Sequence, residues 1–168
     1  YSSAIGIDRS IFFGSNDGNL YGLTAESELM WKYQTGDFIN ASPVIDMDGN
    51  LVFGGGDKHL YVIMPGGMVK WSYELGDKVV ATAAIDDQGV IYVGTWDDHL
   101  YAIGPEGAFL WKVATGDNIY GSATIGGDGT LYFGSYDGRV YAVKTASTGP
   151  AMSHWAQFHH DSKNTGMY

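Results

Sequence analysis

The chain has no cysteine, and its 168 residues include only nine basic residues against 19 acidic ones. Without cysteine it has neither a disulfide framework nor thiol chemistry. A net charge of −10 argues against nucleic acid and anionic membrane surfaces as partners, because both require clustered lysine and arginine. No apolar run approaches the roughly 20 residues that span a bilayer. We therefore expect no nucleic-acid partner and no membrane partner.

Helical patterning is also absent, since no apolar pattern at helical spacing persists along the chain. Short apolar or aromatic runs alternate instead with turn signals such as Asp-Gly. In residues 41–75 the runs are "ASPVID", "LVFGG", "LYVIM" and "VKWSYEL", separated by "MDGN", "GDKH" and "PGG". Glycine accepts a positive φ without a steric penalty, so Asp-Gly favours a tight hairpin. These runs predict short β-strands joined by hairpins.

One unit recurs with a period of 40 residues. The landmarks in phase are Gly14, Gly54, Gly94 and Gly134; Tyr21, Tyr61, Tyr101 and Tyr141; and Trp31, Trp71 and Trp111. A period of about 40 residues matches one four-stranded propeller blade. We predict an all-β chain that forms a β-propeller of four-stranded antiparallel blades, with four blades per chain. Strand A of each blade is expected to be innermost, and strand D to carry the tryptophan.

The predicted blades span residues 1–36, 37–76, 77–116 and 117–161, and 162–168 form a terminal tail. The fourth unit departs from the pattern after Val143, where "KTASTGPAMSHWAQFHHD" replaces the expected loop and strand. We interpret this segment as a lengthened C–D loop, with Trp155 as the strand D tryptophan of the last blade. It resembles a terminal segment, so any further blades are expected upstream, and the chain is expected to be half or part of a larger ring.

The unit "DG.LYFGS.DG.LYA", followed by "LWK..TGD", resembles the pyrroloquinoline-quinone-like (PQQ-like) propeller repeat. That resemblance implies rings of seven or eight blades. The family includes quinoprotein dehydrogenases, which pair the quinone with calcium, a catalytic aspartate and often a vicinal disulfide. Here there is no cysteine, Arg9 and Arg139 are the only arginines, and no blade carries a polar set absent from its sisters. We therefore expect no catalysis and no cofactor.

Residues that recur in every blade are interpreted as structural. The turn aspartates Asp17, Asp57, Asp97 and Asp137 are expected to cap their own turns. The alternative is a ring of carboxylates that attracts a cation or a basic partner. The tryptophans Trp31, Trp71, Trp111 and Trp155 are expected to pack between adjacent blades.

Two other groups have the composition of metal sites. The segment "DMDG" at 46–49 places aspartates at alternate positions, as calcium loops do, but its sister loops "DDQG" and "GGDG" indicate a plain hairpin. His154, His159, His160 and Asp161 alternate between the two faces of an extended strand, so fewer than the three or four ligands of a zinc site converge. We predict no metal site.

Departures from the repeat are the best candidates for function. Large or variable side chains stand at blade tips where the fold requires none: Asn16, Phe38, Trp96, Tyr120 and Tyr136. Exposed aromatics beside acids are typical of a binding surface. The favoured function is a non-catalytic scaffold for protein–protein interaction, the alternative is carbohydrate binding, and a quinoprotein dehydrogenase fragment comes third.

The partner is expected to be an unidentified protein. The chain is expected to be exported, to the periplasm or outside the cell. Either a homodimer closes an eight-bladed ring or a longer chain supplies the remaining blades.

Overall fold

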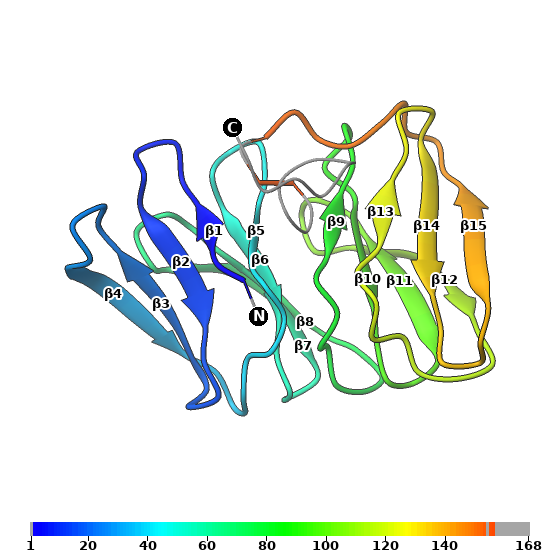
Figure 1. Cartoon of the computed structure of the whole chain (residues 1–168), viewed down its shortest axis with the longest axis horizontal. Coiled ribbons are helices and arrows are strands. Elements are labelled where there is room, and N and C mark those ends of the chain that lie inside the picture. Colours follow the sequence, from blue (N-terminus) through cyan, green and yellow to red (C-terminus); the bar gives the residue numbers. More distant parts are fainter. Residues whose placement is uncertain (1, 154, 157–168) are drawn as a thin grey trace.

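The computed structural model describes residues 2–153 and 155–156, which form four antiparallel sheets in chain order (Figure 1). The predicted all-β fold of successive 40-residue blades is confirmed. Among these residues, three sheets have four strands and the last has three. Within the described residues, no helix has the length and apolarity that a membrane crossing requires.

Each sheet is a meander in which strands consecutive in sequence pair antiparallel. We letter the strands of each blade A to D in chain order and name each turn or connection by the two strands that it joins. Blade 1 comprises β1 (Ala4–Ile5), β2 (Ile11–Gly14), β3 (Asn19–Leu23) and β4 (Leu29–Gln34). Blade 2 comprises β5 (Val44–Ile45), β6 (Leu51–Gly54), β7 (His59–Ile63) and β8 (Val69–Glu74). Blade 3 comprises β9 (Ala84–Ile85), β10 (Ile91–Gly94), β11 (His99–Ile103) and β12 (Phe109–Ala114). Blade 4 comprises β13 (Thr124–Ile125), β14 (Thr130–Gly134) and β15 (Val140–Lys144).

The strand D tryptophans join each blade to the next. The indole N–H of Trp31 donates to the carbonyl of Pro65 at 2.8 Å, and that of Trp71 donates to the carbonyl of Pro105 at 3.0 Å. A Cβ atom added to Gly67 would lie 2.8 Å from the Trp31 ring. The absence of a side chain at that turn therefore lets the indole lie directly on the following blade.

The two ends of the row of blades have uncovered apolar faces. At one position of strand C the side chain is fully buried by the next blade in blades 1 to 3: Leu20, Leu60 and Leu100. The equivalent Val140 of blade 4 is 81% exposed. On the opposite face, Phe53 of blade 2 is 0% exposed, whereas the equivalent Phe13 of blade 1 is only partly buried. Closing this surface requires further blades.

The prediction that Trp155 is the strand D tryptophan of blade 4 is wrong. The described residues after β15 do not form a strand D but cross to the inner edges of blades 3 and 2 (Figure 1). Ala151 donates its N–H to the carbonyl of Ile85 at 2.8 Å, and Ile45 donates its N–H to the carbonyl of Trp155 at 2.7 Å. Trp155 is buried there, 4% exposed.

The short A strands explain this path. Strands of two residues leave backbone donors and acceptors at their inner edges, and buried backbone groups require partners. The lengthened connection after β15 is able to reach them. The predicted boundary at 161 and the tail 162–168 lie outside the described residues.

The B–C turns provide a test of backbone conformation. The same turn position has φ of 80° at Gly18, 70° at Lys58, 65° at Asp98 and 80° at Gly138. A Cβ atom at Gly138 would meet nothing within 4 Å, so Gly138→Ala tests conformation alone. We expect it to lower the free energy of unfolding by about 1 kcal/mol, and Lys58→Gly to raise it by up to about 1 kcal/mol. Urea unfolding measures both, and changes of the same sign would contradict this explanation.

Candidate binding surface

The blade tips that vary in sequence are brought together by backbone hydrogen bonds between blades. In each bond the residue before a turn aspartate donates its N–H to the D–A connection of the preceding blade. The pairs are Gly56 to Phe38 at 2.8 Å, Trp96 to Lys78 at 3.1 Å, and Tyr136 to Asn118 at 3.0 Å. Two positions that are distant in sequence therefore become neighbours at every blade interface.

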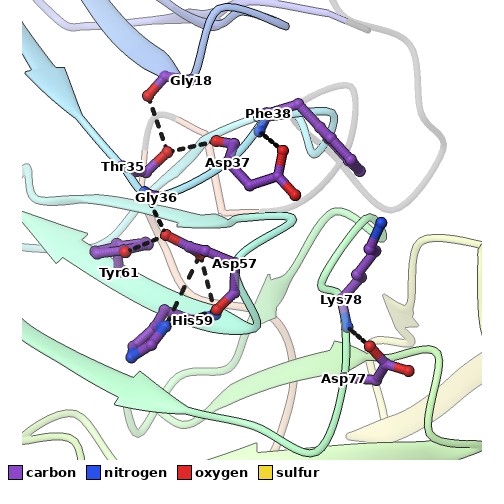
Figure 2. Close-up of polar contacts among 10 residues, drawn as sticks. All are labelled: Gly18, Thr35, Gly36, Asp37, Phe38, Asp57, His59, Tyr61, Asp77 and Lys78. Atoms are coloured by element: carbon purple, nitrogen blue, oxygen red, sulfur yellow. Dashed lines mark hydrogen bonds and ion pairs between the residues drawn. The ribbon is translucent and has the colours of Figure 1, made fainter.

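The turn aspartates reinforce the same contact. Figure 2 shows Asp57 between Tyr61 of its own blade and Gly36 of the preceding one. Its Oδ2 accepts from the Tyr61 hydroxyl at 2.6 Å and from the Gly36 N–H at 2.7 Å, while Oδ1 accepts from the His59 N–H at 3.3 Å. The carboxylate caps its own turn and also clamps the neighbouring blade. Sequence reasoning found the first role and missed the second.

Hydrogen bonding and burial shift the pKa of one member in two of these pairs. The hydrogen bond from Tyr141, together with backbone bonds from Gly116 and Arg139, lowers the pKa of Asp137 despite some desolvation. Burial, followed by the bond to Asp57, raises the pKa of Tyr61 well above its usual value. Carboxylates held in this way serve the blade interface, which weakens the alternative of a cation-attracting ring.

Five side chains form a continuous row across the tips of blades 3 and 4 and the connections that lead into blades 2, 3 and 4. We call Phe38, Lys78, Trp96, Tyr120 and Tyr136 the aromatic row. The Lys78 ammonium lies 5.1 Å from the centre of the Phe38 ring and 5.6 Å from that of Trp96. The Trp96 and Tyr120 ring centres are 4.8 Å apart, and those of Tyr120 and Tyr136 are 4.7 Å apart. Figure 2 shows the Lys78 side chain directed toward Phe38.

A pocket of about 420 Å³ opens beside this row. Its other walls are small and uncharged, and they come from the segments that lead into the A strands. The lining residues are Phe38, Asn40, Ser42, Val80, Thr82, Trp96, Tyr120 and Ser122. Ser42 donates its N–H to Thr82 Oγ1 at 3.1 Å, so the hydroxyl residues also tie neighbouring blades together. The pocket offers aromatic faces and neutral hydrogen-bonding groups to a ligand.

Three of the five predicted surface residues line this pocket: Phe38, Trp96 and Tyr120. Tyr136 extends the row next to Tyr120. Asn16 is exposed on blade 1 and does not line the pocket, which is formed by residues 38–122 of the described chain. Sequence reasoning missed Lys78, although the position was already visible as a departure from the repeat, with phenylalanine and asparagine in the sister blades.

A calcium site at residues 46–49 would need the Asp46 carboxylate as a ligand, but this carboxylate already accepts hydrogen bonds from its own turn. Asp46 Oδ1 accepts from the N–H groups of Asp48 at 2.9 Å and Asn50 at 2.8 Å, and Oδ2 accepts from Asn50 Nδ2 at 2.8 Å. This is the pattern of a hairpin cap. His154, His159, His160 and Asp161 lie outside the described residues, so the prediction for that group stays a prediction.

Comparison with solved structures establishes the architecture. BamB from Moraxella catarrhalis superposes with a TM-score of 0.73 and 25% identity, over 89% of this chain and 46% of BamB. The WD40 β-propeller domain of Doa1 superposes with a TM-score of 0.75 and 15% identity, over 84% of this chain and 49% of that one. The four sheets are blades of a β-propeller. The chain spans about half the length of both proteins. No protein-family model and no curated protein matches it.

The clamp between blades is testable with a matched pair of variants. Asp57 bonds to the preceding blade, whereas the equivalent Asp17 bonds, among the described residues, only within its own blade. Asp57→Ala should lower the free energy of unfolding by about 2–3 kcal/mol, because the hydrogen bonds of a charged carboxylate to the Tyr61 hydroxyl and the Gly36 N–H are both lost. Asp17→Ala should cost less. Denaturant unfolding measures the difference, and equal losses would show that the bond between blades contributes nothing.

Proposed function

We propose that this chain is a non-catalytic propeller scaffold that binds another protein through the aromatic row. One observation carries the proposal: large side chains that the repeat does not require come from successive blades and lie against one another at the surface. Tyr120 is 42% exposed and Tyr136 is 64% exposed. Clustered tyrosine and tryptophan are the side chains that dominate the energetics of protein interfaces.

Carboxylates that flank the row, together with the net charge of the protein, indicate the kind of partner. Asp37 and Asp117, which lead the connections next to Phe38 and Asn118, are exposed carboxylates. The protein as a whole carries a charge of −10. A partner surface that combines apolar groups with basic side chains fits this arrangement, because complementary charge accelerates association and selects among partners.

The non-catalytic assignment is supported by the uniformity of the blades. Catalysis needs a polar set that one blade has and its sisters lack. The repeated aspartates are instead engaged in equivalent hydrogen bonds in successive blades, as Asp57 and Asp137 illustrate.

We further propose membership of the PQQ-like repeat family without its quinone chemistry, supported by the repeat landmarks and the 25% identity to BamB. Export, to the periplasm or outside the cell, fits a chain without cysteine.

Carbohydrate binding is the second candidate. It is favoured by the lining of the pocket, in which Asn40, Ser42 and Thr82 occur together with Trp96. Aromatic faces combined with neutral polar groups suit the apolar faces and hydroxyls of sugar rings. The two candidates use the same residues and differ in the ligand.

Selection from a peptide library tests the first candidate. Random peptides displayed on phage would be selected on the wild-type protein and then titrated against Trp96→Gly and Tyr136→Asn. Both replacements are residues that sister blades already carry at this position, at Gly56 and Asn16. Selected peptides should lose at least about tenfold in affinity, since losing a buried aromatic anchor costs 2 kcal/mol or more. Unchanged affinity in both variants would refute the row as the binding surface.

Calorimetric titration with cello-, malto- and chito-oligosaccharides tests the second candidate. Saturable binding that Trp96→Gly abolishes would replace the first candidate with the second.

We also propose that two copies close an eight-bladed ring, with blade 4 of each chain against blade 1 of the other. The proposal is supported by the complementary exposed positions, Val140 at one end and Phe13 at the other, whose equivalents are buried at every internal interface. A twofold arrangement covers both ends at once and leaves no open face. Four further blades of a longer chain would have the same effect, and the chain spans about half the length of BamB.

Light scattering at low micromolar concentration tests the ring. Two chains of 18.2 kDa give about 36 kDa, whereas Val140→Asp should give single chains because it places a charge in the new interface. Val69→Asp, on an outer strand of blade 2 and 43% exposed, is the control and should remain paired. A stable single chain for the wild type would exclude the homodimer.

A further inference from the structure

A second hollow lies between blades 1 and 2, at the opposite end of the blades from the aromatic row. It is a cleft of about 460 Å³ at the A–B turns. Four exposed apolar side chains line it: Ile7 at 77%, Met30 at 41%, Met47 at 54% and Met152 at 95% exposed. We call it the methionine cleft. Exposed apolar side chains that gather around one hollow indicate an interaction site, whereas isolated ones do not.

The repeat does not require these side chains. Ile7 and Met47 occupy the same position of their A–B turns, where blades 3 and 4 carry Asp87 and Gly127. The turn therefore forms equally well with a charged residue or with no side chain. At this position, apolar residues occur only in the two turns that border the cleft. Like the members of the aromatic row, they are side chains that the repeat itself does not require.

The unusual path of the terminal segment completes the cleft. After leaving blade 4 the chain runs along the inner edge of blade 2, where Ser153 Oγ donates to the carbonyl of Ile45 at 2.6 Å. That bond sets Met152 beside the turn that carries Met47. Had residues 150–156 formed a strand D on blade 4, this wall of the cleft would be absent.

Carboxylates border the apolar floor. Asp8, Asp46 and Asp48 line the same cleft. The first two cap their own turns: Asp8 Oδ1 accepts from the Ser10 N–H at 3.0 Å, and Asp46 holds its hairpin as described above. The side chain of Asp48 accepts no hydrogen bond from the described residues and is exposed, so it is available to a ligand.

We propose that the methionine cleft binds a basic amphipathic segment of another protein. Methionine side chains are flexible and polarisable, and they adapt to varied apolar faces. An apolar face of such a segment fills the hollow while its lysines or arginines meet the carboxylates at the border. The same carboxylates disfavour an anionic lipid surface. Because the cleft and the aromatic row lie at opposite ends of the blades, the two surfaces are able to hold two partners at the same time.

A labelled model peptide tests the proposal directly. The probe is a fluorescein-labelled amphipathic helix of leucine and lysine, and binding to the full chain is followed by fluorescence anisotropy. Met47→Asp should weaken binding at least about tenfold, because an apolar side chain at the centre of the contact is replaced by a charge that is costly to bury. The sister residue Asp87 shows that the turn accepts aspartate, and circular dichroism of the variant should be unchanged. Asp48→Asn should reduce the salt dependence of binding.

Met68→Asp is the matched control, because Met68 is 65% exposed and does not line the cleft. It adds the same charge and should leave affinity for a basic peptide unchanged or slightly higher. Equal weakening by both variants would overturn the proposal, as would equally tight binding of a peptide with glutamate in place of lysine. Binding of phosphatidylcholine vesicles that depends on Met47 would overturn it in favour of a lipid surface.

Discussion

The contact between successive blades is the constraint on which the rest of this structure depends. A four-stranded sheet with two apolar faces cannot bury either face alone, so each blade is stable only against its neighbours. Three groups of bonds hold that contact: the indole of strand D on the next C–D turn, the turn aspartate on the preceding Gly-Asp connection, and the backbone bond beside it. The glycine, aspartate, tyrosine and tryptophan of the repeat are the residues that make this contact.

Side chains are free to vary only where they point away from that contact. The turn tips and the D–A connections meet this condition at one end of the blades, and the A–B turns meet it at the other. Both the aromatic row and the methionine cleft occupy such positions. The scaffold thus holds side chains from different blades at fixed separations, which lets surface loops carry function without altering the core. The proposed functions use this rigidity to present preorganised surfaces.

The open ends of the row of blades follow from the same constraint. Val140 and Phe13 are apolar because every blade is built to have a neighbour on both sides, and the exposure of Val140 measures what is missing there. The terminal segment supplies partners of a different kind, because it forms backbone hydrogen bonds with the inner strands of blades 2 and 3 instead of adding a strand to blade 4. The terminal segment thus covers the inner edges of blades 2 and 3, while the end faces of blades 1 and 4 remain open to a neighbour.

The sequence by itself determined the blade, its strand order and its hairpins, because these depend on local alternation and on a period that repeats without interruption. It also determined which tips are unusual, since Phe38, Trp96, Tyr120 and Tyr136 stand out against their sister units. It did not determine the destination of Trp155, because an apolar aromatic in an extended segment is buried equally well on an outer strand or on an inner edge. Only the tertiary structure decided that Lys78 joins the aromatic row and that Met152 meets Met47. Those neighbours come from separate turns and from the terminal segment, and their proximity is set by the packing of one blade on the next and by the path of the chain after β15.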